Sequence, residues 1–271
     1  MNAHRAATPP PAAASLFACS SCKLREWCMP VDFSGPALDR LSTGFSLLRS
    51  VPRGVTLFQM DDPFEALYAV RSGFFKTRVA CPDRGDQVTG FQMPGDILGL
   101  DGISTDRHCC DAVALEDSQV CVIAYDELEH LARGRSELQH QFHKIMGGEI
   151  VREQIVMMLL GNTRAEERVA AFLLNLAARL RARDLSPDKL VLRMTREEIG
   201  SYLGLKLETV SRCFSKLNEE GVLHVRQRHI RIVDEAALDK LVNRAKWLKP
   251  AGLMGAQAAA QHGAAASATS G

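Results

Sequence analysis

The sequence has no run of apolar residues long enough to cross a membrane, and it carries little net charge. A membrane-spanning helix needs about 20 consecutive apolar residues, and no stretch of this 271-residue chain approaches that length. The formal net charge is +1, so a basic surface for a nucleic acid would have to be local. Apolar residues make up 46% and charged residues 24%, which is the ordinary composition of a soluble protein.

The chain also lacks the marks of an enzyme and of an export signal. No glycine-rich nucleotide loop or acid–base constellation stands out, so we expect a protein that is not an enzyme. The segment AAASLFAC, ending at Cys19, faintly resembles a lipoprotein signal. Its apolar stretch is minimal, and three prolines at 9–11 interrupt the region before it. We therefore expect a cytoplasmic protein.

Composition divides the chain into a sheet-forming part and a helical part between two low-complexity ends. Residues 1–18 are rich in Ala and Pro, and residues 250–271 are of similarly low complexity, so we expect both ends to be disordered. Within 19–135, short strand-like runs such as LYAVR, FFKTRV, QVTGFQM and QVCVIA alternate with turn signals. Turns at this spacing predict an antiparallel barrel or sandwich, and helical connections for a parallel sheet are missing.

Residues 136–161 predict one long helix, because the stretch has no proline and its apolar residues recur at helical spacing. A coiled-coil-like seam runs along it. The seam consists of Met146, Ile150, Glu153, Met157 and Leu160. The spacing fits two interpretations, a core helix packed on its own domain or a helix that pairs with its twin in a homodimer. In a dimer, two Glu153 carboxylates would repel each other by about 1 kcal/mol or more and weaken the pairing.

Residues 162–249 predict a winged helix-turn-helix. A helix over about 165–183 comes first, and the capping box Thr195-x-x-Glu198 then opens a short helix that ends at Gly204. A second helix over about 207–220 stops at Gly221, and VLHVR and HIRIV follow as two strands of a hairpin. Helix, tight turn, helix and hairpin are typical of a DNA-binding module.

The second helix of this module carries the candidate base-reading residues. Glu208, Ser211 and Arg212 lie within little more than one turn, and these side chains can pair with cytosine, with either base and with guanine, respectively. The same helix should bury Val210, Phe214 and Leu217. Further expected DNA contacts are Lys206, Thr209, Lys216 and Arg228.

Local charge favours DNA binding over a merely solvated helix face. Residues 193–249 contain 12 Lys and Arg against 8 Asp and Glu, a local excess of +4, and binding to phosphates requires such an excess. Lys206 stands near the N-cap of the reading helix, where Ser or Thr would satisfy an orphan amide. A DNA phosphate could supply the missing acceptor there.

Three cysteines lie within a dozen residues in the stretch CSSCKLREWCMP. Cys19, Cys22 and Cys28 have the spacing Cys-x₂-Cys-x₅-Cys, whereas structural zinc usually takes two close pairs. Iron–sulfur clusters are also held by cysteine thiolates, so the spacing leaves both possibilities open. A fourth ligand must come from elsewhere: Cys121 is the natural candidate, Cys109 and Cys110 are rivals, and spacing alone does not choose between them.

These motifs together resemble the oxygen-sensing FNR branch of the cyclic-AMP receptor protein/FNR superfamily of bacterial transcription regulators. The resemblance runs from about residue 19 to residue 244. Its matching stretches are CSSCKLREWC, LFQMDDPFEALYAVRSG, GDQVTGFQMPGDILGLDGI, LEDSQVCVIA, AEERVAAFLLNL and MTREEIGSYLGLKLETVSR. The resemblance implies an α+β chain with an N-terminal antiparallel β-roll of the cyclic-nucleotide-binding, jelly-roll type, a long dimerisation helix and a C-terminal winged helix-turn-helix.

The resemblance also implies a cofactor and partners. Cys19, Cys22, Cys28 and Cys121 would ligate a 4Fe–4S cluster, and the cluster-loaded homodimer would bind TTGAT-type inverted repeats in double-stranded DNA without oxygen. Oxygen would convert the cluster to 2Fe–2S or destroy it, and the dimer would dissociate. RNA polymerase would contact barrel loops near residues 71–75 and 81–85. The other cysteines, including Cys109 and Cys110, would be small core or strand residues.

One departure from the superfamily concerns cyclic nucleotides. The cyclic-nucleotide branch holds a phosphate with an Arg-Ser pair after the GDILGLDGI region, where this chain has Cys109 and Cys110, and Arg107 is offset. Asp101 would repel a phosphate, so we expect no cyclic nucleotide. The alternative to the cluster is a zinc-structured regulator of the same superfamily that binds some metabolite in its barrel.

Overall fold

The computed structural model describes residues 15–16, 47–81, 85–185 and 189–243. The chain divides into two compact units. The first comprises Met1–Arg78 and Phe91–Leu138, and the second comprises Val79–Gly90 and Gln139–Gly271. No helix in the described part of the chain is long and apolar enough to span a membrane.

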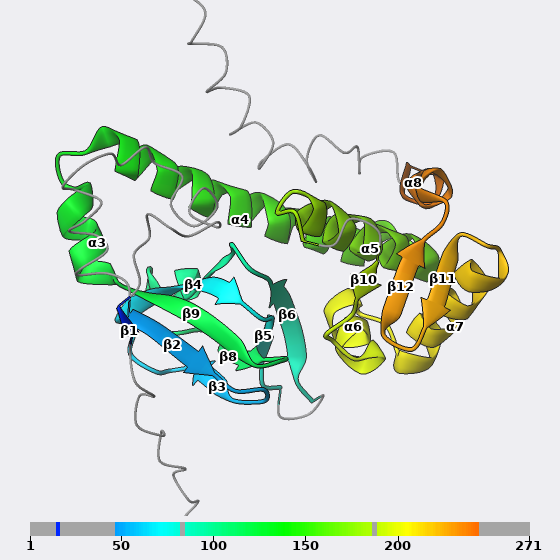
Figure 1. Ribbon diagram of the computed structural model, residues 1–271, viewed down its shortest axis with the longest axis horizontal. Helices are drawn as coiled ribbons and strands as arrows, with labels where there is room; N and C mark the ends of the chain where they lie inside the picture. Colours follow the sequence, from blue (N-terminus) through cyan, green and yellow to red (C-terminus); the bar gives the residue numbers. More distant parts are fainter. Residues whose placement is uncertain (1–14, 17–46, 82–84, 186–188, 244–271) are drawn as a thin grey trace, which may run out of the picture. The chain divides into compact units, whose positions relative to one another are not determined.

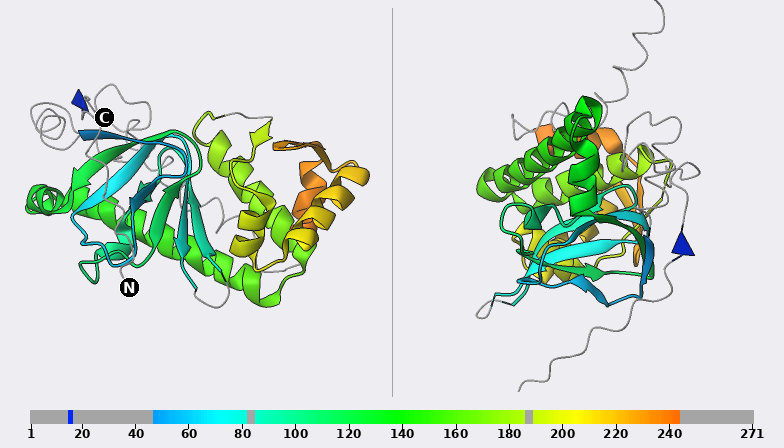
Figure 2. Two further views of the ribbon diagram at one scale, coloured as in Figure 1. Left: turned by 90° about the horizontal axis from the view of Figure 1, so that it is seen from below. Right: turned by 90° about the vertical axis from the view of Figure 1, so that its left-hand side faces the viewer.

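The N-terminal part of the chain forms two sheets whose strands curve around a common interior (Figures 1 and 2). These strands belong to the first unit except for residues 79–90, which are counted with the second. One sheet has the order β1-β2-β9-β4-β7, and the other has the order β3-β8-β5-β6. The strands of the first are β1 (Ser15–Leu16), β2 (Leu47–Val51), β4 (Ala66–Ser72), β7 (Ile97–Leu98) and β9 (Ser118–Ala124). Those of the second are β3 (Thr56–Phe58), β5 (Phe75–Val79), β6 (Gln87–Gln92) and β8 (Asp111–Ala114).

Antiparallel pairing and an apolar interior confirm the predicted β-roll. β9 pairs antiparallel with β2 on one side and β4 on the other, and β8 does the same with β3 and β5. Val70, Phe75, Met93 and Val120 are completely buried inside the roll. In β9, Val120 and Ile123 are buried whereas Cys121 and Val122 are half-buried.

The structure differs from the sequence-based expectation at the borders of the roll. Ser15–Leu16, expected within the disordered N-terminus, forms β1 and pairs with β2. A short 3₁₀ helix, η2 (Leu100–Gly102), and the helix α3 (Tyr125–Ala132) follow β7 and β9, respectively. Neither stands out in the sequence, because each is short and carries few periodic apolar residues.

The helix α4 (Ser136–Asn162) spans 27 residues and agrees with the predicted long helix to within one residue. Two glycines, Gly147 and Gly148, interrupt its side-chain surface near the middle. A methyl group at either position would meet no heavy atom of the described residues within 4 Å. Steric crowding by the described residues therefore does not explain why glycine occupies these two positions.

The C-terminal unit contains the predicted helix-turn-helix and hairpin. Its helices are α5 (Ala165–Arg181), α6 (Arg196–Leu203), α7 (Leu207–Glu219) and α8 (Glu235–Asn243). Its strands are β10 (Leu190–Val191), β11 (Leu223–Arg226) and β12 (His229–Ile232), which form an antiparallel sheet in the order β10-β12-β11. Figure 1 shows the hairpin β11–β12 beside α7. β10 and α8 were not anticipated from the sequence.

Candidate nucleic-acid interface

The turn between α6 and α7 is set by a capping box and by a left-handed glycine. The backbone N–H of Glu198 donates to Thr195 Oγ1 at 3.1 Å, and the backbone N–H of Thr195 donates to Glu198 Oε2 at 2.6 Å. Gly204 ends α6 with φ 62° and ψ 38°, a conformation that favours glycine. The backbone N–H of Leu205 then donates to Gly200 O at 2.8 Å. These local contacts confirm the predicted start and end of α6.

Helix α7 has a buried face and an exposed face, as the sequence predicts. Val210, Phe214 and Leu217 are at most 3% exposed, and burying such a side chain contributes about 1.5–3 kcal/mol. On the other face Glu208 and Arg212 are exposed and Ser211 is half-buried. Arg212 Nη2 lies 3.5 Å from Thr209 Oγ1, so a weak contact ties two of the predicted DNA-contacting residues together.

The N-terminus of α7 lacks a side-chain cap. Lys206 is the N-cap residue, with extended φ and ψ, and its side chain makes no cap hydrogen bond. The first amides of a helix need acceptors from outside the helix, and its N-terminus attracts anions. Lys206 is itself exposed, as is Arg228 in the β11–β12 turn. This end of α7 therefore offers both amides and a cation to a phosphate.

Two residues of this module take roles that the sequence did not indicate. The Arg196 guanidinium lies over the Phe214 ring, 3.4 Å from its centroid, and burial lowers the pKa of Arg196 to about 10. Lys216, predicted to contact DNA, also pairs with Glu166 of α5 at 2.7 Å. The Glu166 hydrogen bond raises the pKa of Lys216. Both contacts join residues distant in sequence, so no local pattern could have revealed them.

The predicted seam lies on an exposed face of α4. Ile150 is 55%, Met157 71% and Leu160 37% exposed; Glu153 is exposed and Met146 is half-buried. Large apolar side chains at helical spacing along one exposed stripe are typical of a surface that pairs with another helix. The stripe is thus left exposed on α4, as the pairing interpretation requires.

The predicted cysteine site can be examined only at Cys121. Cys19, Cys22 and Cys28 lie outside the described residues, and within the described residues no three His, Cys, Asp or Glu side chains form a metal-binding group. Cys121 lies in β9, opposite Leu48 of β2 and Ala69 of β4. It is half-buried, whereas its neighbour Val120 is completely buried in the core. A thiol on the outer side of the roll suits ligation by a segment outside the core.

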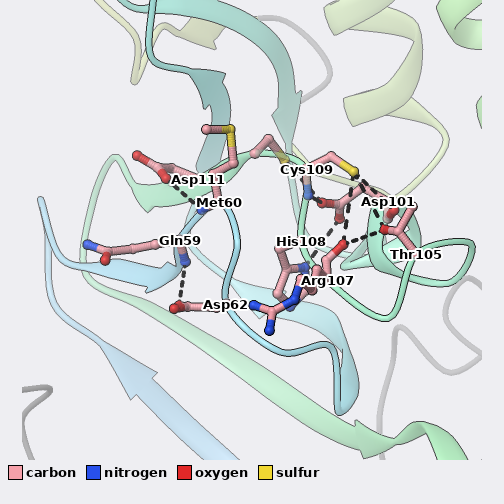
Figure 3. A network of polar contacts seen from close by, with 10 residues as sticks. Gln59, Met60, Asp62, Asp101, Thr105, Arg107, His108, Cys109 and Asp111 are labelled. Carbon is pink, nitrogen blue, oxygen red and sulfur yellow. Dashed lines mark hydrogen bonds and ion pairs between the residues drawn. The ribbon is translucent and has the colours of Figure 1, made fainter.

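The rival ligands Cys109 and Cys110 are engaged by a different group, the Asp101 carboxylate (Figure 3). The backbone N–H of Cys109 donates to Asp101 Oδ2 at 2.7 Å, and Cys110 Sγ lies 3.6 Å from the same oxygen. Burial, together with the Asp101 charge, strongly raises the pKa of Cys110. Cys110 is thus a buried thiol that faces a carboxylate, whereas metal ligation uses the thiolate. Cys110 is a buried residue as expected, but for Cys109 that expectation is wrong, since it is exposed in a bend before β8.

The same loop contains the Asp101 carboxylate, which would repel the phosphate of a cyclic nucleotide. Burial raises the pKa of Asp101, but the His108 imidazole and the N–H of Cys109 act against it, and the net effect is a lowered pKa. The carboxylate is therefore held as an anion. Arg107, drawn in Figure 3, donates from Nη1 to Asp61 O at 2.5 Å.

Comparisons with known proteins agree with this architecture. The profile of the Crp-like helix-turn-helix domain matches residues 167–241, and that of the cyclic nucleotide-binding domain matches residues 48–135. The transcriptional regulatory protein btr of Bordetella pertussis is 44% identical over 226 residues, which cover 83% of this chain and 93% of the relative. The fumarate and nitrate reduction regulatory protein of Escherichia coli is 36% identical over 228 residues, covering 84% and 91%.

A solved structure extends the similarity to three dimensions. FixK2 from Bradyrhizobium japonicum is 32% identical, with a TM-score of 0.67 over 72% of this chain and 96% of that chain. Together with the two domain matches and the curated relatives, this similarity covers the roll and the helix-turn-helix. The chain therefore belongs to the CRP/FNR superfamily of transcription regulators, as a regulator of the FNR type.

Proposed function

We propose that the protein is an oxygen-responsive transcription regulator that acts as a homodimer on inverted-repeat DNA in the cytoplasm. The single observation that carries the DNA-binding part is α7, on which Glu208 and Arg212 stay exposed over a fully buried core face. Ser211 completes a reading surface suited to TTGAT-type half-sites. Two copies joined along the exposed stripe of α4 would present two such helices to a repeat.

The oxygen response is assigned to the cysteines. Cys19, Cys22, Cys28 and Cys121 would hold a 4Fe–4S cluster, which supplies an oxygen-sensitive centre converted by oxygen to a 2Fe–2S form. Cys121 supports this assignment because its half-buried position on β9 sets it apart from Cys110, whose thiol is buried and held protonated. The similarity to an anaerobic regulatory protein and to a fumarate and nitrate reduction regulatory protein agrees with such a role.

Two further parts of the proposal concern other partners. RNA polymerase would contact the turns near residues 71–75 and 81–85; residues 82–84 lie outside the described part of the chain. In the first turn, a methyl group at Gly73 would collide with Ser118, so the shape of this turn depends on glycine. We expect no cyclic nucleotide in the roll, because Asp101 remains anionic where a phosphate would have to approach.

The decisive experiment is anaerobic purification followed by absorption spectroscopy, iron and sulfide counts, and DNA binding before and after exposure to air. We expect an iron-containing, coloured protein whose affinity for a TTGAT inverted repeat falls in air. Cys121→Ser should abolish the iron content, whereas the control Cys109→Ser should retain it. A colourless protein that contains zinc, or operator affinity indifferent to air, would overturn the proposal.

A further inference from the structure

One side chain joins the ends of two helices in the C-terminal unit. Arg168, in the first turn of α5, donates from Nη2 to Leu160 O at 2.9 Å and from Nε to Thr163 O at 3.2 Å. It also donates from Nη1 to Leu203 O at 2.9 Å. Leu160 lies in the last turn of α4, and Leu203 is the last residue of α6.

Two of the three acceptors, Leu160 O and Leu203 O, are helix-end carbonyl groups that need such a donor. The last four carbonyl groups of a helix have no partner within the helix, and helix C-termini attract cations. Arg168 meets both requirements for α4 and α6 at once, because its planar fork presents several N–H groups in fixed directions. The relative position of the two helix ends is therefore defined by one guanidinium group.

A side-chain contact accompanies these hydrogen bonds. A methyl group at Gly204 would lie 3.2 Å from Leu160 Cδ2 and 3.4 Å from Arg168 Nη1. The turn that aims α7 is thus packed closely against Leu160. Leu160 is also 37% exposed at the end of the seam on α4, so it belongs to both the pairing face and the helix-turn-helix.

We infer that Arg168 is a positioning residue that couples the pairing face of α4 to the orientation of the recognition helix α7. A shift of Leu160 on pairing would move its carbonyl and its side chain, and Arg168 and Gly204 would carry that shift to the start of α7. The inference rests on the proposed DNA-binding homodimer and adds the residue that aligns its two reading helices. It does not depend on the cluster.

The nearby pair Glu166–Lys216 supplies a matched control. It also joins α5 to the helix-turn-helix, through one contact of 2.7 Å between exposed side chains. Exposed ion pairs are screened by water and contribute little. Glu166→Gln removes this contact between α5 and α7 and leaves the carbonyl groups at the ends of α4 and α6 undisturbed.

The experiment compares Arg168→Lys with Glu166→Gln at protein concentrations at which sedimentation shows dimers. Lys keeps the charge but cannot hold three carbonyls in the geometry of the fork. The first probe is a duplex with a TTGAT inverted repeat at the half-site spacing that the wild-type protein binds most tightly. The second has one additional base pair between the half-sites. A protein with two aligned reading helices distinguishes these spacings.

We expect Arg168→Lys to lower the affinity for the first duplex about tenfold and to reduce discrimination between the two duplexes. The dissociation constant of the dimer and the salt dependence of DNA binding should stay unchanged. Glu166→Gln should change affinity less than threefold. Unchanged spacing discrimination in Arg168→Lys would overturn the inference, and a reduced salt slope would show a phosphate contact instead.

If Arg168→Lys does not fold, Leu160→Val, which shortens the side chain facing Gly204, must give the same loss of discrimination. Failure of the wild-type protein to bind either duplex would overturn the proposed function as well, whereas normal wild-type binding with an unaffected variant overturns the coupling alone.

Discussion

Replacing Met157 by alanine should weaken self-association strongly, because this side chain has the most surface to lose to a partner. Met157 is 71% exposed within the single chain. Full burial of a methionine side chain is worth about 1.5–3 kcal/mol, so a partner helix that covers the exposed part contributes about 1–2 kcal/mol for each copy. A symmetric dimer buries two copies. Two copies contribute about 2–4 kcal/mol, and alanine keeps part of this contact, so truncation should cost about 2–3 kcal/mol. This cost corresponds to a dissociation constant raised roughly 30- to 150-fold.

The neighbouring residue provides the control. Met158 is 42% exposed but is rotated by about 100° around the helix axis, away from the stripe that contains Ile150 and Leu160. Sedimentation of the anaerobically purified variants over a concentration series measures both effects. Met158→Ala should change the dimer constant less than about threefold, given the angle between the two side chains. Equal effects of the two substitutions, or no effect of Met157→Ala, would refute the assignment of this stripe as the pairing face.

Three further predictions concern the seam, the reading helix and the turn. Glu153→Ala should tighten the dimer by about 1 kcal/mol, because two like charges leave the seam, and should leave DNA binding less sensitive to air; an unchanged dimer constant in aerobic sedimentation would argue against the repulsion. Arg212→Ala should cost about 1–3 kcal/mol on the preferred operator and blur the preference at one guanine, whereas an equal loss on random DNA would identify a phosphate contact. Gly204→Ala should lower the free energy of unfolding by about 1–3 kcal/mol, since a left-handed residue costs about 1–2 kcal/mol and the new methyl group would press on Leu160 at 3.2 Å. Gly147→Ala should instead raise it, because none of the described residues lies within 4 Å of the new methyl group; thermal melting compares the two, and similar shifts would contradict the reasoning.

Features coded by short segments were predictable from the sequence. The buried face of α7 and the interior of the roll follow from periodicity, because a period near 3.6 or 2 fixes which residues face inward. The capping box at Thr195 and the left-handed turn at Gly204 follow from the chemistry of single residues. The bounds of α4 were predictable because a long stretch without proline carries a continuous helical pattern.

Features that depend on tertiary contacts were not predictable. Nothing near Arg168 in the sequence indicates that its partners are Leu160, Thr163 and Leu203, because those carbonyls belong to backbone, which carries no sequence signal. Cys109 was expected to be a small core or strand residue. It lies in an exposed bend, where its N–H donates to the Asp101 carboxylate, eight residues away in the sequence. The short helices α3 and α8 owe their place to packing rather than to a strong periodic pattern.

The glycine pair in α4 links helical order to self-association. Each glycine in a helix interior costs about 0.8–1 kcal/mol relative to alanine, and no neighbour among the described residues comes within 4 Å of a methyl group at Gly147 or Gly148 to justify that cost. In a monomer, α4 is therefore locally less stable near its middle, and the α4 helix of a partner lying alongside would stabilise it. In the proposed homodimer, the rigidity of α4 would depend on both copies, so a signal that changes dimerisation would also change how rigid this helix is.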